Sequence, residues 1–291
     1  MNNKVARASD ASNDVRFDRP ILIVSPPRSG STLLFETMEK APGLFSIGTE
    51  SHVAIESIPA FHPANRSWHS NRLIAADAGT PAAGRLADGF YSELRDRDGN
   101  RASGSVRILE KTPKNSLRIP FFAAMWPDAV FIYLYRDVRR TLASMMEAWA
   151  SGHFRTYPQL PGWTGQPWSL LLVPGWQELK GKPLPVVVAH QWAITTRIML
   201  DDLEALPTDR VRALRHSDFV ADPDVRISAL ARSLDLGWDR PLDAALPLSK
   251  YTVSRPDPEK WRRLEHLIDP VMPIVAEADA RAREFVRRFD G

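Results

Sequence analysis

Residues 21–40 contain the feature that most constrains how this chain can fold. A β-branched run, Ile21–Val24, leads into a tight polar turn, PPRSGS, and a helical pattern starts at Thr32. The backbone N–H groups of such a turn, with the unpaired N–H groups and positive dipole end of the next helix, form a cradle for an anion. Arg28 adds a positive charge. The same residues also suit an ordinary strand-to-helix turn, in which they only cap the helix. The residues that follow the other strands must therefore decide between an anion-binding turn and a purely structural one.

The turn matches part of the ATP-binding pattern G-x-x-x-x-G-K-[ST]. Gly30 and Thr32 are in place, but Ser25 stands at the first Gly position and Ser31 at the Lys position. The lysine that would contact a terminal phosphate is therefore missing. An ATP-dependent phosphotransferase is favoured by the loop and opposed by Ser31.

Strands and helices are expected to alternate along the chain. The sequence predicts strands at residues 21–24, 106–109, 130–135 and 211–214. It predicts a helix from Asp137 onward, and helices at residues 32–40, 82–97, 114–126, 187–205, 223–234, 258–267 and 272–287. This alternation predicts an α/β fold with a P-loop-like parallel β-sheet flanked by helices.

Length and composition limit the number of domains and the class of partner. With 291 residues, of which 44% are hydrophobic, the chain suits one large domain, expected at 20–291 after a flexible N-terminal arm, 1–19. A formal net charge of +3 is too balanced for a sequence-independent nucleic-acid binder. The absence of cysteine excludes disulfides, cysteine-ligated zinc and thiol nucleophiles. The apolar runs are far shorter than the roughly 20 residues that span a bilayer, and the arm lacks a signal-peptide core, so we expect a cytoplasmic protein.

Residues 151–185 interrupt the alternation. The segment is rich in Pro and Gly and carries three tryptophans without a clean period, Trp163, Trp168 and Trp176. We interpret it as an ordered, aromatic-rich insertion or lid within the domain. With Trp149 and Trp192, these rings either wall an acceptor pocket or pack under a long loop. Aromatic walls suit phenols, sugars, lipids and peptides alike, so the acceptor stays open.

Polar and cationic residues follow all four predicted strands. They are residues 28–32, 110–113, 136–137 and 215–218. Because ligands of open parallel sheets bind beyond the carboxyl ends of the strands, we expect these groups to converge on one edge. Two separated phosphates account for two cationic clusters better than a triphosphate, whose charge magnesium would partly neutralise. An acid to hold Mg²⁺ is not evident, because Asp137 fits a helix N-cap better.

Three ordered motifs within residues 21–149 resemble the family of sulfotransferases that use 3'-phosphoadenosine 5'-phosphosulfate (PAPS). They are residues 26–32 (PPRSGST), 110–115 (EKTPKN) and 135–140 (YRDVRR) through Ser144. Within that family the chain is most similar to the bacterial and tyrosylprotein type. The resemblance implies sulfuryl transfer with release of 3'-phosphoadenosine 5'-phosphate (PAP), and a P-loop-like sheet. Because the sequence shows no metal, flavin or Rossmann fingerprint and its seven histidines are not paired with carboxylates at helical ligand spacing, we expect the transfer to need no metal.

The resemblance also assigns nucleotide-binding residues. Arg136 and Ser144 would bind the 3'-phosphate, and the 5'-phosphosulfate would be held by Arg28, Ser29, Gly30, Ser31 and Thr32. His216 stands where relatives carry a tyrosine that helps to seat the nucleotide. A late loop adds Ser254, Arg255 and Lys260.

The catalytic assignments rest on the same resemblance. Glu50 stands where the tyrosylprotein type carries a glutamate base, although a free Glu, with a pKa of about 4.3, is a weak base. His52 is the rival, because an imidazole titrates nearer neutrality. Lys111 would stabilise charge on the bridging oxygen as the bisphosphate leaves, and Arg28 would contribute to the same catalysis.

We therefore expect an enzyme that transfers a sulfuryl group in line from PAPS to a hydroxyl or amine, without a covalent enzyme intermediate. The acceptor would be a small molecule, glycan, lipid or peptide, and the oligomeric state is open. Besides the ATP-dependent phosphotransferase, a non-catalytic nucleotide- or glycan-binding protein remains an alternative, because fold analogy alone does not license a reaction.

Overall fold

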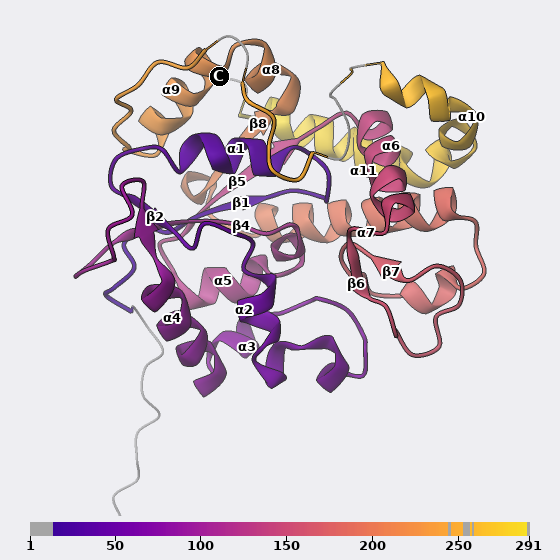
Figure 1. Cartoon of the computed structure of the whole chain (residues 1–291), viewed down its shortest axis with the longest axis horizontal. Helices are drawn as coiled ribbons and strands as arrows, with labels where there is room; N and C mark the ends of the chain where they lie inside the picture. Colours follow the sequence, from indigo (N-terminus) through magenta and orange to yellow (C-terminus); the bar gives the residue numbers. More distant parts are fainter. Residues whose placement is uncertain (1–13, 244–245, 253–256, 258, 290–291) are drawn as a thin grey trace, which may run out of the picture.

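The computed structural model describes residues 14–243, 246–252, 257 and 259–289. At its centre lies a six-stranded sheet in the order β3-β2-β4-β1-β5-β8 (Figure 1). In that order the strands are β3 (Arg95–Asp96), β2 (Leu44–Ser46), β4 (Arg107–Lys111), β1 (Ile21–Val24), β5 (Val130–Tyr135) and β8 (Val211–Arg215). Neighbouring strands run parallel except β2 and β3. The expected mostly parallel sheet is confirmed.

Helices cover both faces of this sheet (Figure 1). One layer holds α1 (Ser31–Met38), α8 (His216–Ala221) and α9 (Pro223–Ser233). The other holds α4 (Pro81–Glu93), α5 (Ile119–Met125), α7 (Leu184–Glu204) and α11 (Met272–Arg287). Side chains alternate along a strand, so Ile21 and Ile23 pack in the first layer and Leu22 and Val24 in the second. Burial on both faces explains the continuous apolar sequence of β1.

The insertion packs against α6 (Val138–Ser151) beside the sheet. It contains the antiparallel pair β6 (Arg155–Tyr157) and β7 (Trp168–Ser169), and the 3-10 helix η4 (Trp176–Leu179). The Trp163 and Trp168 ring centroids are 4.8 Å apart and nearly perpendicular. Trp149 and Trp192 belong to the same cluster. Of the two interpretations of these tryptophans, packing under the loop is confirmed.

The four predicted strands are confirmed within one or two residues, whereas β2 and β3 were not predicted. The helix expected at 114–126 is divided into the 3-10 helix η3 (Pro113–Leu117) and α5. Pro120 explains the division, because proline inside a continuous helix removes a backbone hydrogen bond. The helix expected at 82–97 ends at Glu93, where the chain turns into β3.

The helix expected at 258–267 is also divided. Residue 258 lies outside the described residues, and the 3-10 helix η6 (Lys260–Leu264) leads into α10 (Glu265–Ile268). The remaining short elements are α2 (His52–Glu56), α3 (Ala75–Ala78), η1 (Pro59–Phe61), η2 (Pro63–Arg66), η5 (Thr208–Arg210) and η7 (Asp269–Val271).

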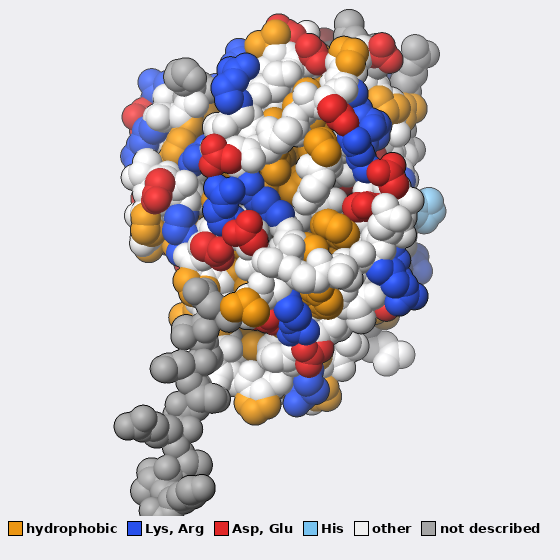
Figure 2. Space-filling model, turned by 90° about the vertical axis from the view of Figure 1, so that its left-hand side faces the viewer, with side chains coloured by type: hydrophobic (Ala, Val, Ile, Leu, Met, Phe, Trp, Pro, Cys, Tyr) orange, Lys and Arg blue, Asp and Glu red, His pale blue; other side chains and the backbone are white. Residues whose placement is uncertain are grey.

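The described part of the expected N-terminal arm packs against the sheet. Phe17 is buried and forms a parallel bridge with Val106, so residues 14–19 do not form a loose arm. Figure 2 shows one face of the molecule, on which Lys and Arg side chains are interspersed with Asp and Glu. That face has no continuous cationic track. In the part of the chain that is described, no helix has the length and apolar character needed to span a membrane.

Candidate active site

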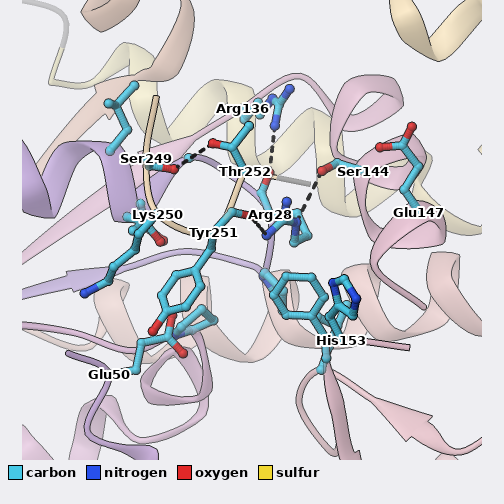
Figure 3. A pocket seen from close by; sticks show the side chains of 18 of the residues that line it. Arg28, Glu50, Arg136, Ser144, Glu147, His153, Ser249, Lys250, Tyr251 and Thr252 are labelled. Carbon is cyan, nitrogen blue, oxygen red and sulfur yellow. Dashed lines mark hydrogen bonds between the residues drawn. The ribbon is translucent and has the colours of Figure 1, made fainter. Parts of the chain in front are cut away.

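A cavity of about 910 Å³ lies at the carboxyl ends of β1, β5 and β8 and beside α6. Its walls come from the turn after β1, from the insertion, and from the segment 246–252 (Figure 3). Val24 pairs with Tyr133 and Tyr135 with Arg215, which places the strand exits on one edge. The predicted convergence of these exits is confirmed.

The turn after β1 has a backbone shape that depends on Gly30. Gly30 has φ +90° and Arg28 has φ +67°, both in the left-handed region. A Cβ placed on Gly30 would lie 2.3 Å from His216 Cδ2. The Ser29 hydroxyl closes the turn by donating to the Pro26 carbonyl at 2.8 Å. Helix α1 follows directly, with no side-chain cap and no acidic residue in its first turn, so its N-terminus is suited to an anion.

Arg28 and Arg136 lie together at this turn. Arg136 Nη1 donates to the Arg28 carbonyl at 2.8 Å, and Arg28 Nε donates to Ser144 Oγ at 3.3 Å (Figure 3). Arg136 Nε is buried and has no hydrogen-bond partner in the described structure. Burial, with the charges of Arg28 and Arg140, lowers the pKa of Arg136 to about 10. Burial also lowers the pKa of Arg28. Two partly desolvated cations and an orphaned donor fit a phosphate group.

Lys111 and Glu50 form an ion pair below the turn. Lys111 Nζ donates to Glu50 Oε1 at 2.6 Å and to Thr32 Oγ1 at 3.0 Å, and the Lys111 side chain is only 2% exposed. His52 Nδ1 lies 3.5 Å from Glu50 Oε2. Burial raises the pKa of Glu50, but the His52 hydrogen bond and the Lys111 charge outweigh it, and the pKa falls to about 2. The structure therefore brings both proposed bases and the proposed catalytic lysine together.

Glu110 holds the Glu50 loop in place, a role that was not predicted. Its carboxylate accepts from Ser51 Oγ at 2.5 Å, Thr112 Oγ1 at 2.8 Å and Asn115 Nδ2 at 2.7 Å. Glu110 is fully buried, which raises its pKa. Because Ser51 follows Glu50, this network fixes the distance between Glu50 and Lys111. The adjacent charges of Glu110 and Lys111 in the EKTPKN motif were the signal in the sequence from which this role could have been found.

Of the remaining residues predicted to bind the nucleotide, two line the cavity and two lie outside the described residues. His216 packs against Gly30 and lines the cavity, and burial next to Arg136 and Arg140 lowers its pKa to about 3. Lys260 also lines the cavity and donates to Glu147 Oε2 at 2.6 Å. Ser254 and Arg255 lie outside the described residues.

Several lining residues were not assigned a role from sequence, and they include Glu56, Lys114, Phe154 and Tyr251. Lys114 Nζ contacts both Glu56 oxygens at 2.8 Å, and burial is the main cause that lowers the pKa of Lys114 to about 8. Phe154 lies in the insertion and Tyr251 in the late loop, where the sequence has no periodic signal. The five tryptophans discussed above are not among the described lining residues. No cluster of three or more potential metal ligands occurs in the described ranges.

Comparisons with known proteins agree with this geometry. The model of the Sulfotransferase family matches residues 20–240. A Caenorhabditis briggsae protein named "Putative protein-tyrosine sulfotransferase" is 24% identical over 131 residues, or 45% of this chain and 44% of that protein. The matched region thus spans less than half the length of this curated relative.

Two solved structures share the fold. The sulfotransferase domain of the Synechococcus PCC 7002 olefin synthase is 17% identical, with a TM-score of 0.50 and coverage of 94% of this chain and 97% of that one. Sulfotransferase STF1 from Mycobacterium tuberculosis is 15% identical, with a TM-score of 0.52 and coverage of 91% and 78%. At these identities the similarity shows the P-loop-like architecture alone. Because the family model matches residues 20–240, from β1 through the last strand of the sheet, the chain belongs to the sulfotransferase family.

Proposed function

We propose that this protein transfers a sulfuryl group from PAPS to an acceptor hydroxyl. The observation that carries the proposal is the pairing of Arg28 with Arg136, whose buried Nε lacks a partner in the described structure, next to Ser144. This arrangement provides a second anion site beside the turn after β1. PAPS carries phosphates at both ends of its ribose, so the two sites match its charges. PAPS supplies the sulfuryl group for transfer.

The residues divide the binding of the donor between them. Arg136 and Ser144 would hold the 3'-phosphate, and the turn Arg28–Thr32 with the α1 N-terminus would hold the 5'-phosphosulfate. Gly30 gives this turn its shape, because its φ is +90° and a Cβ there would lie 2.3 Å from His216 Cδ2. Lys260 and His216 line the same cavity and would complete the nucleotide wall.

Glu50 would take the proton from the acceptor hydroxyl as the new oxygen–sulfur bond forms. The bond between sulfur and the bridging oxygen breaks in the same step, and Lys111 and Arg28 stabilise the charge left on that oxygen. Lys111 holds the pKa of Glu50 low before the donor binds. When Lys111 turns to the phosphosulfate, the pKa of Glu50 rises and the carboxylate becomes a better base. His52, next to Glu50, stays the rival for this role.

Calorimetry with PAP, adenosine 5'-phosphate and ATP, each with EDTA, tests the second anion site. Loss of a charge-assisted contact costs about 1.5–3 kcal/mol, so PAP should bind roughly 10- to 150-fold more tightly than adenosine 5'-phosphate. Arg136→Gln should remove this difference. Arg139→Gln is the matched control, because Arg139 pairs with Asp269 outside the cavity lining. Equal affinities for all three ligands would refute the assignment.

Transfer itself is measured with ³⁵S-labelled PAPS and a set of hydroxylated acceptors. Labelled product that depends on Lys111 supports the reaction. Transfer of phosphate from labelled ATP, with none from PAPS, would favour the phosphotransferase alternative. Binding of PAP without transfer to any acceptor would favour the non-catalytic alternative.

A further inference from the structure

Two aromatic rings lie against the two cations assigned to the phosphosulfate. Arg28 Cζ is 4.8 Å from the centroid of the Phe154 ring. Lys111 Nζ is 5.5 Å from the centroid of the Tyr251 ring. Both distances are within the range in which a cation is attracted to a ring face. Thus, in this state, each cation covers part of an aromatic surface in the cavity.

Both rings belong to segments outside the sheet, and backbone contacts hold these segments in place. The Phe154 carbonyl accepts from Leu170 N at 3.0 Å. The Tyr251 carbonyl accepts from Arg28 Nη1 at 3.1 Å. In Figure 3 the Tyr251 ring lies next to Glu50, with Arg28 above it and His153 on the opposite side of the view. The Tyr251 ring is therefore positioned beside the proposed base, and the Phe154 ring lies against Arg28.

Binding of the donor is expected to change which aromatic surfaces of the cavity are available to an acceptor. A phosphate carries full negative charge and accepts charge-assisted hydrogen bonds, which are about twice as strong as neutral ones, whereas a ring face attracts a cation only through its quadrupole. Arg28 and Lys111 are thus expected to turn from the rings to the bound phosphates. The faces of Phe154 and Tyr251 then lose their cations and are free for an acceptor.

Several polar groups near the insertion side of the cavity already have partners. Lys114 is bound to Glu56 and to the Tyr157 hydroxyl, at 2.8 and 3.0 Å. Thr156 Oγ1 donates to the Leu170 carbonyl at 2.5 Å. A polyol bound against these groups would leave several hydroxyls unpaired, which is costly. An apolar molecule with one hydroxyl avoids this cost.

We propose that Phe154 and Tyr251 determine acceptor specificity, and that the acceptor is an aryl alcohol whose ring binds the two faces that the nucleotide frees. This inference rests on the proposed function, because it requires a bound nucleotide. The chemistry is the same for a small phenol and for a tyrosine side chain in a peptide. Acidity agrees with it: a phenol has a pKa of about 10, and it loses its proton to a weak carboxylate base far more readily than an aliphatic alcohol does.

The first experiment measures coupling between the two ligands on the full chain. The affinity for 2-naphthol is determined by calorimetry with and without saturating PAP. PAP should raise it at least fivefold, and by reciprocity 2-naphthol should raise the affinity for PAP by the same factor. Equal affinity with and without PAP would overturn the inference. Failure of PAP to bind would instead overturn the proposed function, so the two failures are distinguishable.

The second experiment uses variants. Phe154→Leu and Tyr251→Leu should each lower kcat/KM for 2-naphthol about 3- to 10-fold, the contribution of one ring pair, and should reduce the coupling. Their affinity for PAP should be unchanged or higher, because the ring no longer competes for a cation. Tyr251→Phe keeps the ring and should keep the coupling. Tyr91→Leu is the matched control, because Arg16 lies 5.2 Å from the Tyr91 ring, which is not part of the cavity lining.

A comparison of acceptors then distinguishes a small phenol from a tyrosine side chain in a peptide. 2-Naphthol and a tyrosine-containing peptide are compared with cyclohexanol and methyl glucoside at equal concentration. Turnover of one or both aryl acceptors, at least tenfold above the others, supports the inference and identifies the source. Cyclohexanol or methyl glucoside turned over as well as the aryl acceptors would contradict it, as would unchanged kcat/KM in both leucine variants.

Discussion

Replacement of Gly30 by alanine tests how the anion-binding turn is built. Gly30 has φ +90°, and a Cβ there would lie 2.3 Å from His216 Cδ2 and 2.6 Å from His216 Nε2. The left-handed backbone costs an alanine about 1–2 kcal/mol, and overpacking against a buried ring costs about 1–3 kcal/mol more. We therefore expect Gly30→Ala to destabilise the protein by about 2–5 kcal/mol.

Each kcal/mol lowers Tm by about 2–4 °C in a chain somewhat shorter than this one, so the variant should melt roughly 4–20 °C lower. The steric part is separable from the backbone part. In a protein that already carries His216→Ala, the imidazole ring is absent. Adding Gly30→Ala to that protein should cost only the backbone share of about 1–2 kcal/mol. The double-mutant cycle should thus give a coupling of about 1–3 kcal/mol.

The assay is thermal and urea unfolding of the four proteins, followed by circular dichroism, with PAP calorimetry as a functional readout. His52→Ala in place of His216→Ala is the control, because His52 is not among the atoms found near the Gly30 position. If the Gly30 and His216 effects add within about 0.5 kcal/mol, the contact between them does not constrain the turn, and the reasoning fails.

Three further outcomes follow from the site and its surroundings. Lys111→Ala should lower kcat about 10²- to 10³-fold in a PAPS transfer assay, as removal of a preorganised charge does, and an unchanged kcat would remove Lys111 from the mechanism. Glu50 has its pKa lowered to about 2 from 4.5, so its contribution to stability, roughly 3 kcal/mol, is present above pH 4.5 and is lost as pH falls toward 2; Glu50→Gln should flatten this part of an acid-unfolding curve. Trp168→Ala should destabilise the protein by about 3–5 kcal/mol but leave the KM for acceptor unchanged, whereas a raised KM would return this tryptophan to the acceptor wall.

The strand exits were predictable because a parallel sheet brings the carboxyl ends of its strands to one edge. That rule alone predicts that Arg28, Arg136 and His216 lie together, and all three line the cavity. The strands β2 and β3 could not be predicted, because they are only three and two residues long and such short segments show no alternation of apolar and polar residues. Phe154 and Tyr251 could not be predicted as neighbours of the cations, because their positions depend on how two irregular segments return to the sheet.

The tryptophans show a different limit of sequence reasoning. An indole in a Pro-rich segment suits a binding wall and a packed core equally well until its N–H partner is known. Trp149 Nε1 donates to Gln191 Oε1 at 3.1 Å, and Trp176 Nε1 donates to the Trp68 carbonyl at 2.7 Å. With the polar atom of each ring satisfied inside the protein, these side chains support the insertion, and the cavity is left to other rings.

The balance of charge along the cavity agrees with the proposal that one site holds two unlike substrates. On the side of the cavity next to Glu50 each buried cation has a carboxylate: Lys111 has Glu50, and Lys114 has Glu56. At the turn after β1, Arg28 and Arg136 contact a hydroxyl and carbonyls, and within the described chain neither has a carboxylate at salt-bridge distance. Uncompensated positive charge in a partly desolvated cleft favours an anion, whereas a compensated end favours a neutral molecule. We therefore propose that the end next to the turn after β1 selects the nucleotide by charge, and that the end next to Glu50 selects the acceptor by shape.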